Sequence, residues 1–254
     1  MSFSKLAVLV SVFFLTSLIS VVTGSTSLIT VPVMIAVGVE PHIAVATNMM
    51  ALIFMSAGGA LPFARKGVIR RSLLPTPIVL TVAGSAVGAL LLLRVPVRAL
   101  QLTIALAMIA VAVFSLMRRD SGTSEHTVSN GRRAVGYAAT FILAVYGGFF
   151  SGGYVTMLTA VFVFCFGLTF LQSVATTKVI NFFSSVVATL VFAAHGVVDY
   201  RLGAVLGVTM FSGALVGGHV AMRLPAIWLR RVFLVTVMAL AANMAFAFIH
   251  SSSR

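Results

Sequence analysis

The sequence predicts an all-α integral membrane protein built from two homologous halves. The chain has 60% hydrophobic and only 8% charged residues over 254 positions, its mean hydropathy is +1.15, and its apolar residues form long runs. A soluble domain would carry about 25% charged residues. Backbone polar groups in lipid must be satisfied internally, and long apolar runs favour helices over the short alternating segments of a barrel.

An internal repeat predicts the two halves. A shift of 129 positions superposes residues 24–96 on residues 153–225 without a gap. Under this shift Gly24 falls on Gly153, Gly38 on Gly167, Gly67 on Gly196, Gly84 on Gly213, Gly88 on Gly217 and Pro96 on Pro225. Because glycine and proline set backbone geometry, their coincidence indicates a tandem duplication. Residues 6–22 then correspond to an internal segment, so we expect the N-terminal helix to be retained rather than cleaved as a signal peptide.

We expect the first membrane repeat at residues 1–117, a polar linker at 118–133, the second repeat at 134–250 and a tail at 251–254. Each repeat contains four long apolar segments, near 6–22, 42–64, 73–93 and 97–116 in the first and near 134–150, 170–194, 202–222 and 226–249 in the second. One further segment in each, near 26–37 and 155–166, is shorter than the roughly 17 to 25 residues that a span needs. These short segments predict hairpins whose tips, at Gly24 and Gly153, lie inside the membrane.

The basic residues predict the sidedness of the halves. The chain has 17 Lys and Arg against 4 Asp and Glu, but the basic residues cluster in short connectors, so the positive-inside bias explains them and no nucleic-acid partner is expected. Inverted halves with both termini outside and parallel halves with eight crossings score equally on this bias, and the parallel arrangement is the alternative. Inversion is favoured because the connector at 65–72 holds four basic residues and its counterpart at 195–201 only Arg201.

The sequence contains no phosphate loop, metal-ligand cluster or nucleophile constellation, so we expect neither an enzyme nor a cofactor. The single cysteine, Cys165, cannot form an internal disulfide. The four acidic residues fall in connectors or at segment ends, which predicts no carboxylate deep in the membrane.

Lys178 is the exception among the basic residues. It lies eight residues inside the segment that begins near Phe170, about 12 Å from the helix end and close to the middle of a roughly 30 Å core. A charge there costs at least ~2.5 kcal/mol and marks a functional pathway, with snorkelling as the alternative. We expect a small anionic substrate as its partner within the lipid bilayer.

Other polar groups are predicted to join Lys178 in a substrate site. The hairpin tips start short helices, whose free N–H groups and dipole favour an anion. The predicted set consists of Gly24, Ser25 and Thr26 at the first tip, Ser151, Gly152 and Gly153 at the second, and Thr47, Asn48, Thr176, Thr177 and Asn181 in the helices that follow.

These residues resemble a known family. A tip followed by an apolar stretch with proline (Gly24 to Pro32), the Gly38 turn, the Ala46-Thr47 helix start, the Gly67 connector and Gly84-x-x-x-Gly88, repeated from Gly153, resemble the sulfite exporter TauE/SafE family of membrane permeases. The likeness covers nearly the whole chain except the linker and tail. It departs from the family pattern in a first tip poorer in glycine and in Val161, which stands where the first half has Pro32.

The resemblance implies a secondary permease that exports sulfite, sulfonates or similar organic anions across the bacterial cytoplasmic membrane. An anion channel using the same positive site without alternating access is the alternative. The sequence leaves open which anion is carried, the direction of transport, whether a proton or a sodium ion is coupled to it, and the oligomeric state.

Overall fold

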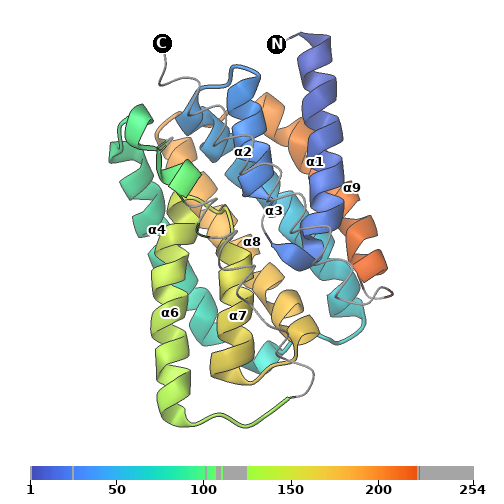
Figure 1. The fold of residues 1–254 in the computed structure, drawn as a ribbon, viewed down its shortest axis with the longest axis vertical. Helices are drawn as coiled ribbons and strands as arrows, with labels where there is room; N and C mark the ends of the chain where they lie inside the picture. Colours follow the sequence, from blue (N-terminus) through green and yellow to red (C-terminus); the bar gives the residue numbers. More distant parts are fainter. Residues whose placement is uncertain are drawn as a thin grey trace.

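The computed structural model describes residues 2–24, 26–100, 102–106, 110, 125–221 and 223, and none of these residues forms a strand. The helices are α1 (Phe3–Thr23), α2 (Ser27–Ala36), α3 (Pro41–Arg65), the 3-10 turn η1 (Arg71–Leu73), α4 (Pro75–Arg94), α6 (Asn130–Phe149), α7 (Tyr154–Phe166), α8 (Phe170–Ala194) and α9 (Tyr200–Ala221). Figure 1 shows a bundle of helices in which the short helices α2 and α7 lie beside α1 and α6.

Five helices within the described residues are apolar and long enough to cross a membrane: Phe3–Val21, Pro41–Arg65, Pro75–Arg94, Phe170–Ala194 and Tyr200–Val220. They confirm a multi-pass helical membrane protein. α6 has 20 residues and begins four residues before the predicted start at 134, because the Ser129 side chain caps it by accepting the Arg132 N–H. Residues 97–100 and 102–106 are helical, whereas half of the predicted segment 97–116 and all of 226–249 lie outside the described residues.

The two predicted hairpins are present. Gly24 ends α1 with φ 76°, and Gly153 precedes α7 with φ 81°. Glycine adopts such left-handed angles without the strain that a side chain brings. In Figure 1, α2 turns back beside α1 and α7 turns back beside α6. A Cβ at Gly24 would lie 2.8 Å from Val155, so the tip of the first hairpin touches the start of the second short helix.

Small residues fix how the long helices run beside one another. A Cβ at Gly203 would meet Met50, and one at Gly218 would meet Pro62, so α9 and α3 run parallel in close contact. In the same way, a Cβ at Gly88 would lie 1.9 Å from the Val145 carbonyl oxygen of α6. α4 and α6 therefore pack through backbone, as small residues allow between membrane helices.

Polar contacts collect at the two ends of the bundle. At one end, His42 lies between the carboxylate of Glu40, 3.0 Å away, and the Val95 carbonyl, 2.9 Å away. Glu40 also accepts the Ile43 N–H and so caps α3. Lys5 donates to the Val37 carbonyl at 2.7 Å nearby. We call this the Glu40 end.

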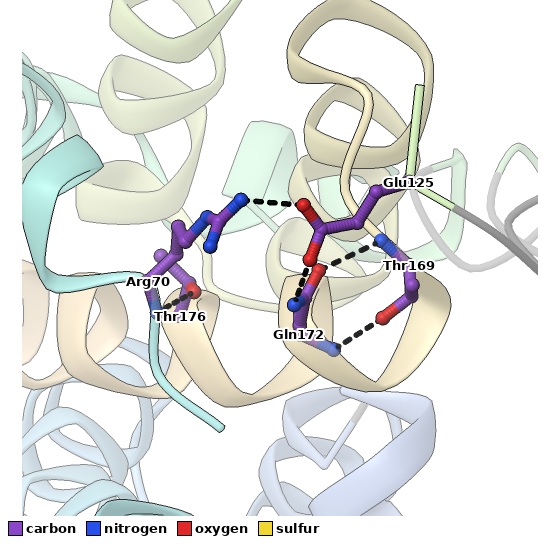
Figure 2. Close-up of polar contacts among 5 residues, drawn as sticks. All are labelled: Arg70, Glu125, Thr169, Gln172 and Thr176. Atoms are coloured by element: carbon purple, nitrogen blue, oxygen red, sulfur yellow. Dashed lines mark hydrogen bonds and ion pairs between the residues drawn. The ribbon is translucent and has the colours of Figure 1, made fainter. Parts of the chain in front are cut away.

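At the other end, the carboxylate of Glu125 joins three parts of the chain. It forms an ion pair with Arg70 of the connector after α3, and it accepts a hydrogen bond from the Gln172 side chain at the start of α8 (Figure 2). Gln172 and Thr169 complete a capping box there. We call this the Arg70 end. Because α3 and α9 run parallel, Arg65 and Arg223 both lie at this end.

Candidate functional site

A small buried cavity lies where the two hairpin tips meet α3 and α8. It has room for about one water molecule. Its lining consists of Gly24, Thr26, Ser27, Leu52, Met55, Ser151, Val155, Lys178 and Asn181. The cavity thus combines one cation and several small polar groups with three apolar side chains.

Lys178 is the charged group of the cavity. The α8 helix carries it in its first half, and only 1% of the residue is exposed. Its ammonium donates to the Ser20 carbonyl of α1 at 3.2 Å, and its Cδ passes Gly59 of α3. A carbonyl oxygen carries only a partial charge, so this contact does not neutralise the ammonium. The side chain is held inside the bundle, not extended toward an interface as a snorkelling lysine would be.

The ends of two short helices face the cavity. Thr26 and Ser27 lie at the start of α2, and Ser151 and Val155 flank the start of α7. The first N–H groups of a helix have no partner within that helix, and the helix dipole adds a partial positive charge there. The cavity therefore receives positive potential from Lys178 and from both helix ends.

Asn181 is a predicted site residue that lines the same cavity as Lys178. Three residues separate the two on α8, so they share a face. The Asn181 amide donates to the Ser56 hydroxyl of α3 at 2.7 Å, which holds α8 against α3. Lys178 of α8 lies next to Gly59 of α3, and Asn181 lies next to Ser56. Because the residue numbers rise along α8 as they fall along α3, the two helices are antiparallel.

Other predicted site residues support the hairpins and do not line the cavity. Asn48 donates to the Ser27 hydroxyl at 2.8 Å and accepts from the Thr30 hydroxyl at 2.7 Å, which ties α3 to α2. The hydroxyls of Thr177 and Thr159 lie 3.2 Å apart and tie α8 to α7. Asn48 and Thr177 thus fix the short helices in place.

Thr47 and Thr176 bind the connectors at opposite ends. The Thr47 hydroxyl accepts the Asp199 N–H at 3.0 Å, and the Thr176 hydroxyl accepts the Arg70 N–H at 3.4 Å. The Gly152 carbonyl accepts from the Tyr146 hydroxyl, and a Cβ at Gly152 would collide with Phe150 and Leu28. These residues therefore shape the surroundings of the cavity. Ser25 lies outside the described residues.

Sequence reasoning missed the apolar wall of the cavity. Leu52 and Met55 of α3 and Val155 of α7 complete the lining. The repeat contains the signal that could have found the first two, because Leu52 and Met55 correspond to Asn181 and Ser184 under the 129-residue shift. Because their equivalents in the second half are polar and near Lys178, Leu52 and Met55 could have been predicted to form the wall of the cavity opposite α8.

The described acidic residues lie away from the cavity. Glu40 and Asp199 are at the Glu40 end, and Glu125 is at the Arg70 end. Within the described part of the chain, no group of His, Cys, Asp and Glu could hold a metal ion. The chemistry that the lining offers is the binding of an anion by a cation, amide and hydroxyl donors and helix ends.

The fold defines a multi-pass helical membrane protein, and its cavity contains a buried lysine. The model of the sulfite exporter TauE/SafE family matches residues 9–244, so the chain belongs to this family. This confirms the resemblance that the glycine and proline pattern indicated.

Relatives match along almost the whole chain. A probable membrane transporter protein, ORF9, of Sinorhizobium sp is 29% identical over 249 residues, covering 96% of this chain and 94% of its own. A probable membrane transporter protein of Haemophilus influenzae is 24% identical over 241 residues, with 95% and 94% covered. The probable membrane transporter protein YfcA of Escherichia coli K12 is 28% identical over 221 residues, with 85% and 81% covered. No solved structure matches. The chain is a membrane transporter and not an enzyme.

Proposed function

We propose that this transporter is a secondary permease that exports small sulfur-containing anions, such as sulfite or sulfonates, across the bacterial cytoplasmic membrane. The observation that carries the proposal is the buried ammonium of Lys178 in a cavity whose lining contains no carboxylate. A charge held in that position is costly, so it indicates a ligand of opposite charge. The family and its name favour oxyanions of sulfur as that ligand.

The proposed site lies between two inverted halves. Two hydrogen bonds support this arrangement: the Asp199 backbone N–H donates to the Thr47 hydroxyl, and the Arg70 backbone N–H donates to the Thr176 hydroxyl. Thr176 follows Thr47 by 129 residues, and Asp199 follows Arg70 by 129 residues, so the two hydrogen bonds correspond under the shift. In one bond the donor belongs to the second half and the acceptor to the first, and in the other bond this is reversed. The antiparallel course of α3 and α8, which correspond under the shift, is what inversion requires.

The charge distribution supports an Arg70 end in the cytoplasm. The basic residues Arg65, Lys66, Arg70, Arg71, Arg132, Arg133 and Arg223 lie there with one described acid, Glu125, whereas Lys5, Arg94, Arg98 and Arg201 of the opposite end are accompanied by two, Glu40 and Asp199. Inverted halves bring 65–71 and Arg223 together, and the parallel alternative separates them. By the positive-inside bias the N-terminus then lies outside.

The proposed mechanism is alternating access, which the paired connector contacts support. Any sulfur oxyanion is larger than one water molecule, so the cavity must widen toward one end to admit it. The Thr47 hydroxyl holds the connector at the Glu40 end, and the Thr176 hydroxyl holds the connector at the Arg70 end. Transport results when one end opens while the other stays closed. An inside-negative potential favours anion exit by about 2.3 kcal/mol per charge per 100 mV, so efflux needs no ATP.

The test is flux in proteoliposomes. We expect saturable sulfite efflux that accelerates with a more negative interior and shows counterflow. Lys178→Met should reduce flux at least tenfold, equivalent to about 1.4 kcal/mol of binding free energy. Lys66→Met, which removes an exposed cation at the Arg70 end, is the matched control and should leave flux unchanged. Flux that never saturates and lacks counterflow would indicate a channel, and normal flux in Lys178→Met would exclude Lys178 from the site.

A further inference from the structure

Three buried hydroxyls of α8 lack a hydrogen-bond partner in the described part of the chain. They belong to Ser173, Ser185 and Thr189, which are 0%, 1% and 9% exposed. A buried hydroxyl without a partner costs about 1 to 3 kcal/mol, so each one needs an explanation. Their positions around the helix separate them into two groups.

Ser185 and Thr189 lie on the same face of α8 as Lys178. They follow Lys178 by seven and eleven residues, close to two and three helical turns, so they deviate from its direction by only about 20°. They extend about 10 and 16 Å from Lys178 toward the Glu40 end. Ser173 precedes Lys178 by five residues and is turned about 140° away. Only Ser185 and Thr189 therefore continue the polar wall that Lys178 and Asn181 begin.

The opposite wall is polar at the same level. α3 and α8 are antiparallel, and the bond between Asn181 and Ser56 sets their register. Counting eight residues forward from Asn181 along α8 and eight residues back from Ser56 along α3, this register places Thr189 level with Asn48. Asn48 there joins Ser27 and Thr30 of α2 in a buried network. Polar groups thus occur on both sides of the line from the cavity to the Glu40 end.

The repeat equivalents of these two hydroxyls behave differently. Ser56 corresponds to Ser185 but receives the Asn181 hydrogen bond, and Ala60 corresponds to Thr189. The free hydroxyls are therefore not a by-product of the duplicated helix. A serine or threonine hydroxyl can rotate to donate to an anion, which would supply the missing partner as a substrate passes.

We propose that Ser185 and Thr189 line the route by which the anion moves from Lys178 to the Glu40 end. The inference rests on the proposed function, since it assumes that the cavity binds an anion. It makes α8 the helix that contributes both the binding cation and the next polar contacts, and it assigns a role to two residues outside the cavity.

The first experiment compares stability with flux. Removing an unpartnered buried hydroxyl with retention of shape is neutral or stabilising. Thr189→Val and Ser185→Ala should therefore leave the unfolding temperature unchanged or raise it, while sulfite efflux from proteoliposomes falls about fivefold or more. Ser173→Ala, the matched control on the other face of α8, should preserve both. Normal efflux in Thr189→Val and Ser185→Ala, or equal losses in Ser173→Ala, would overturn the proposal.

The second experiment does not depend on flux. In a Cys165→Ala background, which removes the single cysteine, Ser185→Cys in intact cells should react with a negatively charged thiosulfonate reagent added outside, and methanesulfonate should slow the reaction. Ser173→Cys should stay unmodified. No modification at 185, or equal modification at 173, contradicts the route. Modification at 185 alone, combined with no transport of any sulfur anion, would place the failure in the proposed function and support the route.

Discussion

α3 and α8 correspond to each other under the 129-residue shift of the sequence, and both have 25 residues. They hold their neighbouring short helix in the same way, α3 through Asn48 and α8 through Thr177. Three equivalent positions differ in polarity: Lys178, Asn181 and Ser184 of α8 correspond to Met49, Leu52 and Met55 of α3. The supporting contacts are duplicated, whereas the charge occurs once. A single cation suffices for one anion, and a second would add repulsion in a medium of low dielectric constant.

The largest expected effect comes from moving the charge between these helices. Lys178→Met combined with Met49→Lys should transport no better than Lys178→Met alone, at least tenfold below the wild type, because Asn181 and the helix ends are arranged around α8. Sulfite efflux from proteoliposomes measures this. Recovery of wild-type flux in the double variant would show that the two helices are functionally interchangeable.

The next effect concerns the supporting contacts. Asn48→Leu removes two buried hydrogen bonds, to Ser27 and Thr30, and Asn181→Leu removes one, to Ser56. Each lost hydrogen bond costs about 1 kcal/mol, and the buried groups left without a partner add to that cost. We therefore expect Asn48→Leu to lower the unfolding free energy by about 3 kcal/mol and Asn181→Leu to lower it by about 1.5 kcal/mol. Denaturant unfolding in detergent measures both. A larger loss of unfolding free energy in Asn181→Leu than in Asn48→Leu would contradict our assignment of Asn48 to structural support and Asn181 to the site.

The connectors provide a smaller comparison. Thr47→Val and Thr176→Val preserve side-chain shape but remove the acceptors for the Asp199 and Arg70 N–H groups. Each should lower the unfolding free energy by about 1 kcal/mol. The loss should be greater for Thr47, whose hydrogen bond is shorter, 3.0 Å against 3.4 Å. Equal stability of both variants and the wild type would indicate that neither contact holds its connector.

The smallest effect depends on pH at the Glu40 end. Burial raises the pKa of Glu40, but hydrogen bonds from the His42 side chain and the Ile43 N–H outweigh it and hold the pKa below its ordinary value. A lowered pKa means that the charged carboxylate stabilises the fold above the ordinary pKa, and that this contribution disappears as pH falls through the lowered value. Glu40→Gln should thus cost about 0.5 kcal/mol at neutral pH, discounted because the side chain is 43% exposed, and nothing in strong acid. A constant difference across pH in thermal unfolding would contradict this.

The fold was predictable where local rules govern it. Long apolar runs require helices in lipid, and the glycines at 24 and 153 permit the left-handed turns that begin the short helices. The depth of Lys178 follows from counting residues along one helix. The start of α6 was placed four residues late because a serine cap, a local hydrogen bond, outweighed the polarity of its first turn.

The sequence by itself determined that this chain is a helical membrane protein with a buried cation, since composition, run length and helical rise need no knowledge of neighbours. Only the tertiary structure decided which polar residues reach that cation. Both Asn48 and Asn181 are polar residues in the first half of an apolar helix, and the sequence predicts both as site residues. In the structure, the Asn48 side chain forms hydrogen bonds with α2, whereas Asn181 lines the cavity. The difference arises from the rotation of each helix about its own axis. Contacts between distant segments, such as Gly203 with Met50 and Lys178 with Ser20, set that rotation.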